Sequence, residues 1–493
     1  MQCSTRQRRA RWLALAWAGC GLTGCVLGPN FQRPASIQAP AYTAAPLVNL
    51  EGQSGAQRLD ATLSVPAQWW SLLQSPRLDA TIRQALAVNR NLTAARATLE
   101  QSAELLRVNE AALYPNVALA ASAGRVKYGA AFLGPEHFPP FTFYSVGPTV
   151  SYAFDYLGSA HRALEQQRSL HESQQHELDA AALSLSGQVA MQALAAAYAR
   201  SQIETVDAVV ADDGTNLKLV QDAFAAGGAT RVDVLNAQSQ LANDQTLLPP
   251  LRRELDLAEH ALALLVGQAP AQWQAPDFRL AEFTLPERLP LTLPSELAHR
   301  RPDILAAEAQ LHAATAAIGV ATANLYPQLT VSANASFQAT ALRDLFDTSG
   351  GGAGITGALT APLFNHGSLR AQQRAAVDAM KASLADYQQV VLGALGQVAD
   401  ALEDLNHDQE LLTSEQSALT TSSDSLALTR ESYSAGNTGV LQVLEAERQN
   451  QQARLGLVRA QVQRLEDSVQ LLLSLGGRVP QPSEPLASDA RSR

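Results

Sequence analysis

One cysteine of the chain has neighbours that fit a defined chemistry. Cys25 ends the run Leu22-Thr23-Gly24-Cys25, which resembles a lipobox, the peptide whose cysteine is lipidated while the chain is cut before it. Four arginines within residues 6–11 and the apolar stretch 12–18 precede it. This order is typical of a secretory signal, because the apolar stretch is too short to span a membrane. An ordinary signal peptide cut at Gly24 and a lipobox ending at Cys20 are the alternatives.

The rest of the sequence offers no catalytic arrangement. It lacks a His-Glu-x-x-His motif, a Gly-Lys-Ser/Thr phosphate loop and a Gly-x-Ser-x-Gly nucleophile motif. Residues 352–357 match Gly-x-Gly-x-x-Gly, but they lead into a predicted strand rather than a helix, which favours a loop. His171 and His176 are five residues apart and poorly spaced as metal ligands on one helix. We therefore predict no enzyme activity, no metal and no cofactor.

Composition excludes further classes. The chain has 493 residues and a net charge of −10, an acidic balance that argues against a nucleic-acid partner. All three cysteines lie within the first 25 residues, which excludes a disulfide framework or a cysteine-based metal site in the body. After the signal no run of about 18 apolar residues follows, which excludes a helical membrane channel.

The body is an internal duplication. Leu113-Tyr114-Pro115 recurs as Leu325-Tyr326-Pro327, and Gly158-Ser159 recurs as Gly367-Ser368. Offsets of 212 residues before each Tyr-Pro and 209 after it also relate several further blocks. Each half therefore predicts the same order of elements: a helix, a pair of strands, a very long helix, a turn and a long helix.

Heptad stripes define the very long helices. The stripes are Ala182, Val189, Ala196, Ile203, Val210, Leu217 and Phe224, and Val391, Val398, Leu405, Leu412, Leu419, Leu426 and Tyr433. A sustained period of seven indicates supercoiled helix packing. Neither 159–224 nor 368–433 contains proline, so each predicts a helix of about 99 Å. Periodicity alone would also fit a plain coiled-coil rod.

Alternating runs predict four strands, at about 115–124, 144–157, 327–337 and 354–364. Each has about ten residues, the length of a tilted transmembrane strand, although core strands of a soluble sheet are the alternative. Four strands cannot close a barrel, and an open edge cannot face lipid. Several chains must therefore contribute, and three chains would supply twelve strands.

These features resemble the TolC-like outer-membrane efflux channels, specifically their lipoprotein branch (OprM- and NodT-like). The matching segments are 25–34, Gln68-Trp69-Trp70, 293–297, Arg300-Arg301-Pro302-Asp303-Ile304, Ala307-Glu308, Tyr326-Pro327, Pro362-Leu363-Phe364 and Leu475-Gly476-Gly477. The resemblance implies an α+β membrane protein whose homotrimer forms a twelve-stranded β-barrel. A periplasmic α-helical barrel with coiled-coil packing would continue it. The implied partners are a periplasmic adaptor (membrane fusion protein), an inner-membrane RND transporter and outer-membrane lipid.

The same resemblance divides the chain into segments. These are a signal peptide (1–24), a lipid-anchored segment (25–65), a first efflux repeat (66–266), an equatorial linker (267–294), a second repeat (295–477) and a tail expected to be disordered (478–493). In the lipoproteins of this kind, Val26 in place of aspartate after Cys25 implies passage to the outer membrane. The chain would then be lipid-anchored there and extend into the periplasm.

The resemblance also assigns functional residues at two helix-turn-helix tips. The predicted adaptor-contact residues are Gly227, Gly228, Thr230, Gly436, Asn437 and Gly439. Leu441, Glu445 and Arg448 match a Leu-Asp-Arg set at the closed periplasmic gate of OprM-like channels, with Glu replacing Asp here, and Asp233 matches the tip acid of the first repeat. An ordinary turn and a solvated ion pair are the alternatives.

The predicted function is that of a passive outer-membrane conduit that exports drugs or toxic small molecules as part of a tripartite pump. A duct for protein secretion with an ABC-type pump and a lipid-anchored coiled-coil scaffold without a pore are the alternatives. The sequence does not identify the exported substrate.

Overall fold

The structure is a computed structural model that describes residues 26–35, 41–44, 57–127, 139–477 and 479. The predicted signal peptide, Cys25 and almost all of the tail lie outside these residues. The chain divides into two compact units, each assembled from three stretches. Unit 1 contains residues up to Pro34, Leu99–Gln174 and Ala307–Tyr387, and unit 2 contains Ala35–Thr98, Gln175–Ala306 and the residues from Gln388 onward.

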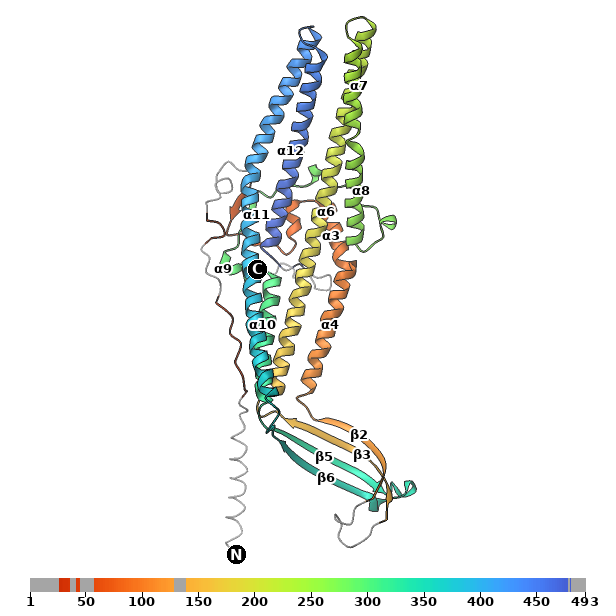
Figure 1. Ribbon diagram of the computed structural model, residues 1–493, viewed down its shortest axis with the longest axis vertical. Coiled ribbons are helices and arrows are strands. Elements are labelled where there is room, and N and C mark those ends of the chain that lie inside the picture. Colours follow the sequence, from red (N-terminus) through yellow and green to blue (C-terminus); the bar gives the residue numbers. More distant parts are fainter. Residues whose placement is uncertain (1–25, 36–40, 45–56, 128–138, 478, 480–493) are drawn as a thin grey trace, which may run out of the picture. The chain divides into compact units, whose positions relative to one another are not determined.

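The predicted duplication is present in the helices (Figure 1). Helices α4 (Arg90–Ala111) and α10 (Pro302–Ala323) both have 22 residues, and α6 (Ser159–Ala225) and α11 (Ser368–Ser434) both have 67. Both ends of α10 follow those of α4 by 212 residues, and both ends of α11 follow those of α6 by 209. The two offsets that were deduced from the sequence therefore map whole helices onto one another.

The returning helices of the two halves differ. In the first half α7 (Arg231–Gln245) and α8 (Leu248–Leu265) are separate, whereas α12 (Val440–Ser474) runs unbroken for 35 residues. Pro249 and Pro250 lie in the first turn of α8, where their missing N–H groups cost no helical hydrogen bond. Positions 458 and 459 of α12, which are equivalent to this proline pair, are Val and Arg, and α12 stays continuous there.

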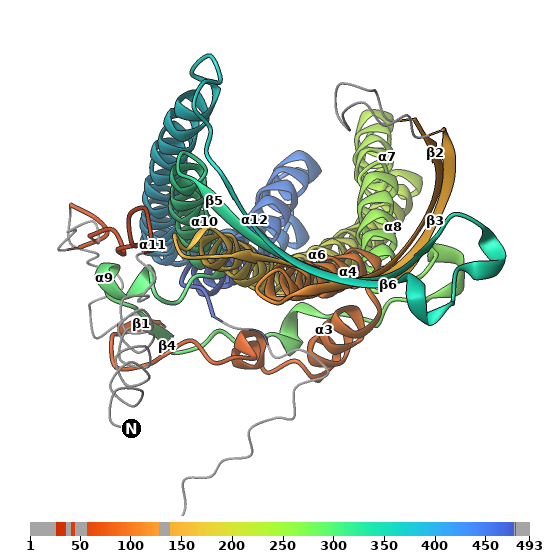
Figure 2. The same ribbon diagram turned by 90° about the horizontal axis from the view of Figure 1, so that it is seen from below.

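Unit 1 contains an antiparallel sheet with the strand order β2-β3-β5-β6 (Figure 2). The strands are β2 (Asn116–Val126), β3 (Phe141–Phe154), β5 (Gln328–Ala339) and β6 (Gly351–Thr360), and the short helices η4 (Leu342–Asp344) and η5 (Thr348–Gly350) lie between β5 and β6. β2 and β6 are the two edges of this sheet. Segments of α4, α6, α10 and α11 form the helical part of the unit.

All four predicted strands exist, with shifted ends. β3 begins at Phe141 instead of 144 and ends at Phe154, and β6 occupies 351–360 instead of 354–364. Pro362 cannot donate to a ladder and follows the end of β6 by two residues. The loop interpretation of residues 352–357 was wrong, because these residues pair with β5. Their glycines conceal the strand, since glycine has low β propensity.

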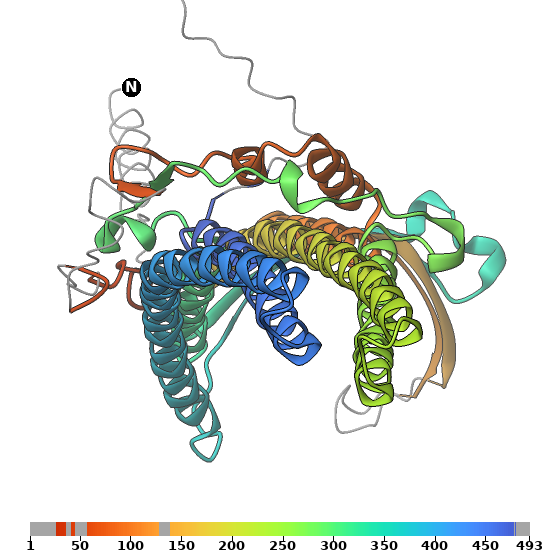
Figure 3. The same cartoon turned by 90° about the horizontal axis from the view of Figure 1, so that it is seen from above.

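Unit 2 also contains short elements beside its parts of the long helices (Figure 3). These are β1 (Arg58–Asp60), η1 (Trp69–Leu73), α3 (Pro76–Val88), η2 (Pro270–Gln272), η3 (Leu280–Glu282), β4 (Arg288–Pro290) and α9 (Pro294–Leu297). The predicted linker 267–294 thus contains β4, which pairs in parallel with β1 from the predicted lipid-anchored segment. Trp69 and Trp70 are 1% and 2% exposed, and the Trp69 indole donates to Ser186 on α6 at 3.0 Å.

The first three positions of each heptad stripe lie in the core of unit 2, whereas Phe224 at the end of the first stripe is 43% exposed. Ala182, Val189 and Ala196 of α6 and Val391, Val398 and Leu405 of α11 are all buried. Windows of α6 and α10 are also long and apolar enough to cross a membrane by composition, but 56% of each window is buried inside the structure. Burial of this kind is what core helices of a soluble domain show, so we assign no membrane span to them.

Candidate functional site

The two predicted tips are built alike. Each long helix ends at a glycine in the left-handed region, Gly227 with φ 77° and Gly436 with φ 75°. One residue later a backbone N–H reaches back to the last helical turn, from Gly228 to the Ala223 oxygen at 2.8 Å and from Asn437 to the Ser432 oxygen at 2.9 Å. This is a Schellman ending, in which glycine avoids the strain that a Cβ would cause. Both hairpins of unit 2 reverse at these turns (Figure 3).

The helices that leave the tips begin differently. Thr230 caps α7 by accepting from the Asp233 N–H, while the Asp233 carboxylate accepts from the Thr230 N–H at 2.8 Å and from its hydroxyl at 2.7 Å. The hydrogen bond from the Thr230 side chain lowers the pKa of Asp233. Gly439 precedes α12 without a side-chain cap. Asp233, expected at the gate, therefore closes a capping box at the tip, and a wider role for it stays a prediction.

The left-handed glycine supports a test of the tip. Gly436→Ala should destabilise the turn locally by about 1 kcal/mol, because a Cβ is strained at this φ although it would meet open space. Hydrogen–deuterium exchange of the amides in 432–440 should accelerate. Gly393→Ala on the same helix also meets open space and should leave the tip amides unchanged. Equal exchange in both variants would contradict a strained turn.

The structure brings two of the predicted gate residues together. Arg448 donates to Glu445 through Nε at 3.1 Å and Nη2 at 2.6 Å, and Gln449 donates to the same carboxylate at 3.0 Å. The Arg448 hydrogen bond lowers the pKa of Glu445, so this carboxylate stays ionised at neutral pH. Leu441 lies one turn nearer the tip and is 58% exposed, unusual for a leucine on a packed hairpin. An exposed leucine next to an ionised pair is an arrangement that a symmetric pore could use as a ring.

An apolar cluster joins the two hairpins near their tips. Val220 of α6, Val234 of α7, and Val440 and Leu444 of α12 are buried together, with Tyr433 of α11 packed against them. Val440 and Leu444 flank Leu441 in sequence but turn inward, whereas Leu441 turns outward. The cluster therefore fixes which face of α12 carries the predicted gate residues.

A buried carboxylate continues this connection on the side away from the tips. Glu447 of α12 accepts from Arg430 of α11 at 2.9 Å and from the Asn216 amide of α6. Arg430 also lies 3.8 Å from Asp212 of α6. Glu447 is only 9% exposed, so this contact links three helices in a weakly hydrated place where charged hydrogen bonds are strong.

Two further acids of unit 2 share this layer. Asp213 of α6 and Asp244 of α7 are 4% and 6% exposed, and their carboxyl groups are hydrogen-bonded to each other. Burial, this hydrogen bond and the nearby charges of Asp244 and Glu447 raise the pKa of Asp213 to about 8. Asp213 is therefore largely protonated at neutral pH, which permits the two carboxyl groups to lie together.

Sequence reasoning missed this polar layer. The available signal was the pair Asp212-Asp213 between the stripe positions Val210 and Leu217 of an otherwise weakly charged stretch. Acidic residues next to a packing stripe indicate either a solvent-exposed helix face or a buried polar contact. Only the partners on α7, α11 and α12 show that the contact here is buried. Those partners are 31 to 235 residues away in sequence, which no local pattern reveals.

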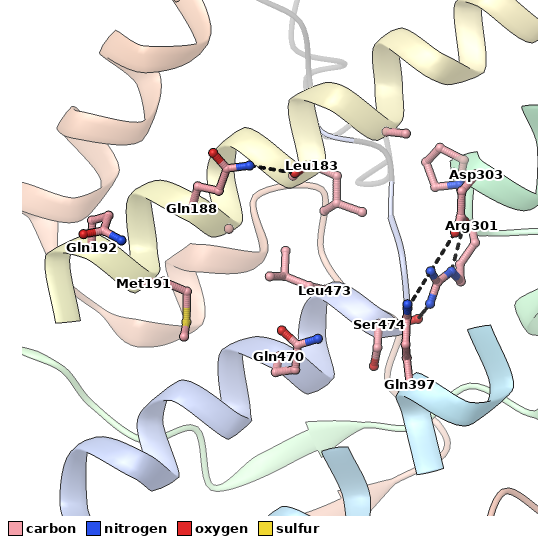
Figure 4. A pocket seen from close by; sticks show the side chains of 14 residues that line it. Leu183, Gln188, Met191, Gln192, Arg301, Asp303, Gln397, Gln470, Leu473 and Ser474 are labelled. Carbon is pink, nitrogen blue, oxygen red and sulfur yellow. Dashed lines mark hydrogen bonds and ion pairs between the residues drawn. The ribbon is translucent and has the colours of Figure 1, made fainter. Parts of the chain in front are cut away.

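A cavity of about 420 Å³ in unit 2 is bordered by a network of hydrogen bonds that join three helices (Figure 4). Its one arginine, Arg301, donates to Asp303 at 2.7 Å, to the Ser474 carbonyl at 2.9 Å and to Gln397 at 2.8 Å. These bonds join the start of α10 to the end of α12 and to α11. Arg301 directly precedes α10, which begins at Pro302.

The residues that follow Cys25 are anchored in unit 1. The Leu27 N–H donates to the Leu157 carbonyl at 3.0 Å, where the strands give way to α6. Arg162, 3% exposed, donates to the Leu27 carbonyl at 3.1 Å and to the Asn30 side chain at 2.7 Å. Phe31 stacks on His312 of α10 with ring centroids 4.4 Å apart. Cys25 itself lies outside the described residues, but its neighbours fix where the chain emerges.

A duplicated chain with a four-stranded antiparallel sheet and long helical hairpins that turn at glycines has the features expected of the outer-membrane efflux channels. Residues 81–268 and 293–477 match the outer membrane efflux protein family, and the chain belongs to that family. The resemblance deduced from the sequence is confirmed, as is the outer-membrane location. Family members and structural neighbours are channels and not enzymes.

Particular relatives extend the match over nearly the whole chain. The pyoverdine export outer membrane protein OpmQ of Pseudomonas aeruginosa is 30% identical over 416 residues, 83% of this chain and 87% of OpmQ. The toluene efflux pump outer membrane protein TtgI of Pseudomonas putida is 27% identical over 92% of this chain and 96% of TtgI. The solved structure of the outer-membrane channel OprN has a TM-score of 0.84 at 28% identity and covers 93% of this chain and 100% of that chain.

Proposed function

We propose that three copies of the chain form the outer-membrane duct of a tripartite efflux pump. The twelve strands would close a barrel in the outer membrane, and the long helices would form a tunnel through the periplasm. The duct would be a passive conduit for drugs or other toxic small molecules. A periplasmic adaptor would contact the two glycine tips, and an inner-membrane RND transporter would supply the energy.

The two faces of the sheet carry this proposal. One register row across all four strands is apolar, Val117, Val150, Ala333 and Ile355, and the adjacent row is polar, Asn116, Ser151, Ser332 and Thr356. Val117 and Ile355 are 68% and 77% exposed, so the described part of the chain leaves this apolar face uncovered. Apolar residues toward lipid and polar residues toward a water-filled lumen are the pattern of a transmembrane barrel.

The sheet edges support closure by further copies. β2 and β6 end the sheet order and have no strand partner on their outer sides among the described residues. In a bilayer an unpaired edge costs several kcal/mol for each unsatisfied group, so edge must meet edge. Three copies give a barrel of twelve strands, an even number that joins β6 of one copy to β2 of the next.

The cargo is proposed at the level of chemical class. The names of two relatives refer to small molecules, pyoverdine for OpmQ and toluene for TtgI. The two names refer to different compounds, which favours selection of the cargo by the pump and adaptor rather than by the duct. We propose the same division of labour for this chain. Lipidation of Cys25 would hold the mature N-terminus at the membrane surface beside the start of α6.

Conductance in planar bilayers tests the pore and its gate. We expect the purified full chain to conduct weakly, and Leu441→Ala/Glu445→Ala to raise the conductance several-fold by removing both the apolar ring and the ionised pair. Leu428→Ala/Glu431→Ala makes the same changes at exposed positions of α11 and should leave conductance unchanged. No conductance from the gate variant would overturn the pore and favour a coiled-coil scaffold.

A deletion strain tests the cargo class. Loss of the gene should increase sensitivity to small toxic compounds, and the wild-type gene should restore resistance. A strain that keeps its resistance but loses one secreted protein would contradict efflux. That outcome would support the duct for protein secretion.

A further inference from the structure

The helices of unit 1 follow the same order as its strands. Hydrogen bonds join α4 to α6 (Ser102 with His171, 2.7 Å), α6 to α10 (Glu165 with His312, 2.9 Å) and α10 to α11 (Thr322 with Gln373, 3.0 Å). The helix order α4-α6-α10-α11 thus parallels β2-β3-β5-β6. One end of the unit carries β2 and α4, and the other carries β6 and α11.

The duplication predicts what should cover these two ends. Because α4 is equivalent to α10 and α6 to α11, the contact of α4 with α6 is equivalent to that of α10 with α11. The contact between the repeats, α6 with α10, has its equivalent in α11 with α4. These two helices lie at opposite ends of the order, so a second copy of the chain must supply one of them.

The residues at the equivalent positions have opposite charges. The contact between the repeats places the Glu165 carboxylate 2.9 Å from His312. The offset of 209 maps Glu165 onto Arg374, and the offset of 212 maps His312 onto Glu100. Both Arg374 and Glu100 are exposed, and within the described part of the chain neither side chain has a hydrogen bond or an ion pair.

The neighbouring charges are complementary as well. The first turns of α11 are positively charged overall, with the bases Arg370, Arg374 and Lys381 and the single acid Asp378. Residues 100–111 of α4 are negatively charged overall, with the acids Glu100, Glu104 and Glu110 and the single base Arg107. The long helices of each repeat run antiparallel to the short ones, so the end of α4 and the start of α11 lie beside the strands. A positive strip on one end of the unit therefore matches a negative strip on the other.

We propose that Arg374 of one copy forms an ion pair with Glu100 of the next, and that this contact repeats around the ring as the intermolecular counterpart of Glu165 with His312. The proposal rests on the proposed assembly of several copies and adds the residues that specify it. It also places the contact: the α11 strip of each copy meets the α4 strip of its neighbour, on the same side as the β6 and β2 edges.

The N-terminal segment fills the groove between α6 and α10. We expect no such segment in the equivalent groove between α11 and α4. Between α6 and α10, Gly28 approaches Gly319 so closely that a Cβ on Gly28 would lie 2.4 Å from the Gly319 Cα, and Arg162 holds the segment. The position on α11 that is equivalent to Arg162 is Ala371, and the position on α4 that is equivalent to Gly319 is Arg107. Neither offers the glycine or the buried arginine, so this groove suits side chains of a neighbouring copy and not a second backbone segment.

Charge exchange tests the pair in the full chain in detergent. Arg374→Glu and Glu100→Arg should each weaken the oligomer roughly tenfold in its dissociation constant, because like charges meet at every interface of the ring. Arg374→Glu/Glu100→Arg should restore the wild-type value. Arg168→Glu, an exposed arginine on the central helix α6, is the matched control and should leave assembly unchanged. Native mass spectrometry and light scattering measure the oligomer.

The outcomes separate this proposal from the assembly itself. An oligomeric wild type whose single variants assemble normally, or whose double variant remains as weak as the single ones, overturns the ion pair and leaves the trimer intact. A monomeric wild type in a lipid-like detergent overturns both. Arg374→Cys/Glu100→Cys supplies a second readout, since oxidation should then link copies covalently into a ladder that ends at three.

Discussion

Arg430→Ala is expected to raise the open fraction of the reconstituted channels, and with it the total conductance of the bilayer, by about tenfold. Arg430 is the cation that holds α11 to the buried Glu447 of α12 at 2.9 Å and approaches Asp212 of α6 at 3.8 Å. Its removal leaves a carboxylate that is 9% exposed without its ionic partner, at a cost of about 1–3 kcal/mol. A change of about 1.4 kcal/mol is tenfold in an equilibrium between closed and open tips.

The effect should concern the tip and not the whole chain. Hydrogen–deuterium exchange should accelerate in 212–220 and 440–447 of unit 2, while the sheet of unit 1 stays protected. Arg252→Ala is the matched control, because Arg252 is 61% exposed and lies 4.0 Å from Asp207, a surface pair that contributes little. Unchanged conductance in a folded, assembled Arg430→Ala protein would show that Glu447 and Asp212 do not hold the tips closed.

Glu447→Gln separates the charge from the shape of this contact. The amide keeps the size of the side chain and can still accept from Asn216 or Arg430, but it no longer forms an ion pair. We expect an intermediate conductance, because one hydrogen bond survives and no bare charge remains buried. A value equal to that of Arg430→Ala would assign the whole effect to the ionic component.

The helices were predictable because their signals are local and repeated. The absence of proline over 159–224 and 368–433, together with the heptad stripes, gives both long helices to within about a residue of their ends. Because the body is duplicated, each element is predicted twice, once in each half. This second prediction made it possible to identify strands with a weak sequence pattern, such as β6. Its glycine-rich start was still assigned to a loop, because glycine carries no pleat pattern.

The candidate site was predictable only in part. The glycine turns are specified locally by Gly227 and Gly436, and the structure places both in the left-handed region. The role of Asp233 is also set by its neighbours in sequence, because the Thr-x-x-Asp spacing at the start of α7 is typical of a capping box. The family resemblance had drawn attention to a gate role instead. Glu447, Asp213 and Asp244 depend on partners from four helices, and such partners become visible only after the hairpins are packed.

The stability of unit 2 is expected to fall as pH rises from about 4 to 8, and Asp213→Asn should reduce that fall. Burial and the hydrogen bond to Asp244 raise the pKa of Asp213 from 3.8 to about 8. Between these values the folded chain binds a proton that the unfolded chain has released, so unfolding releases a proton and becomes more favourable as pH rises. The contribution is fully favourable below about pH 4 and lost above about pH 8.

Several groups set the size of this slope. Asp213 faces Asp244 of α7, Glu447 of α12 and its own neighbour Asp212, all of which oppose its ionisation. On α11 burial and the hydrogen bond to Asp467 raise the pKa of Asp408 to about 7, which acts in the same direction. Asp213→Asn should therefore weaken the pH dependence, and Asp213→Asn/Asp408→Asn should weaken it further.

Thermal unfolding at pH 5, 6, 7 and 8 provides the measurement. Asp213→Asn keeps a group that can donate to Asp244 without releasing a proton, so its midpoint should exceed that of the wild type at pH 8 and approach it at pH 5. Asp222→Asn makes the same change at an exposed acid of α6 and should retain the wild-type slope. If Asp213→Asn and Asp222→Asn lose stability in parallel from pH 5 to 8, the shared proton between α6 and α7 does not exist. The layer that joins the hairpins would then be held by Arg430 and Glu447 alone.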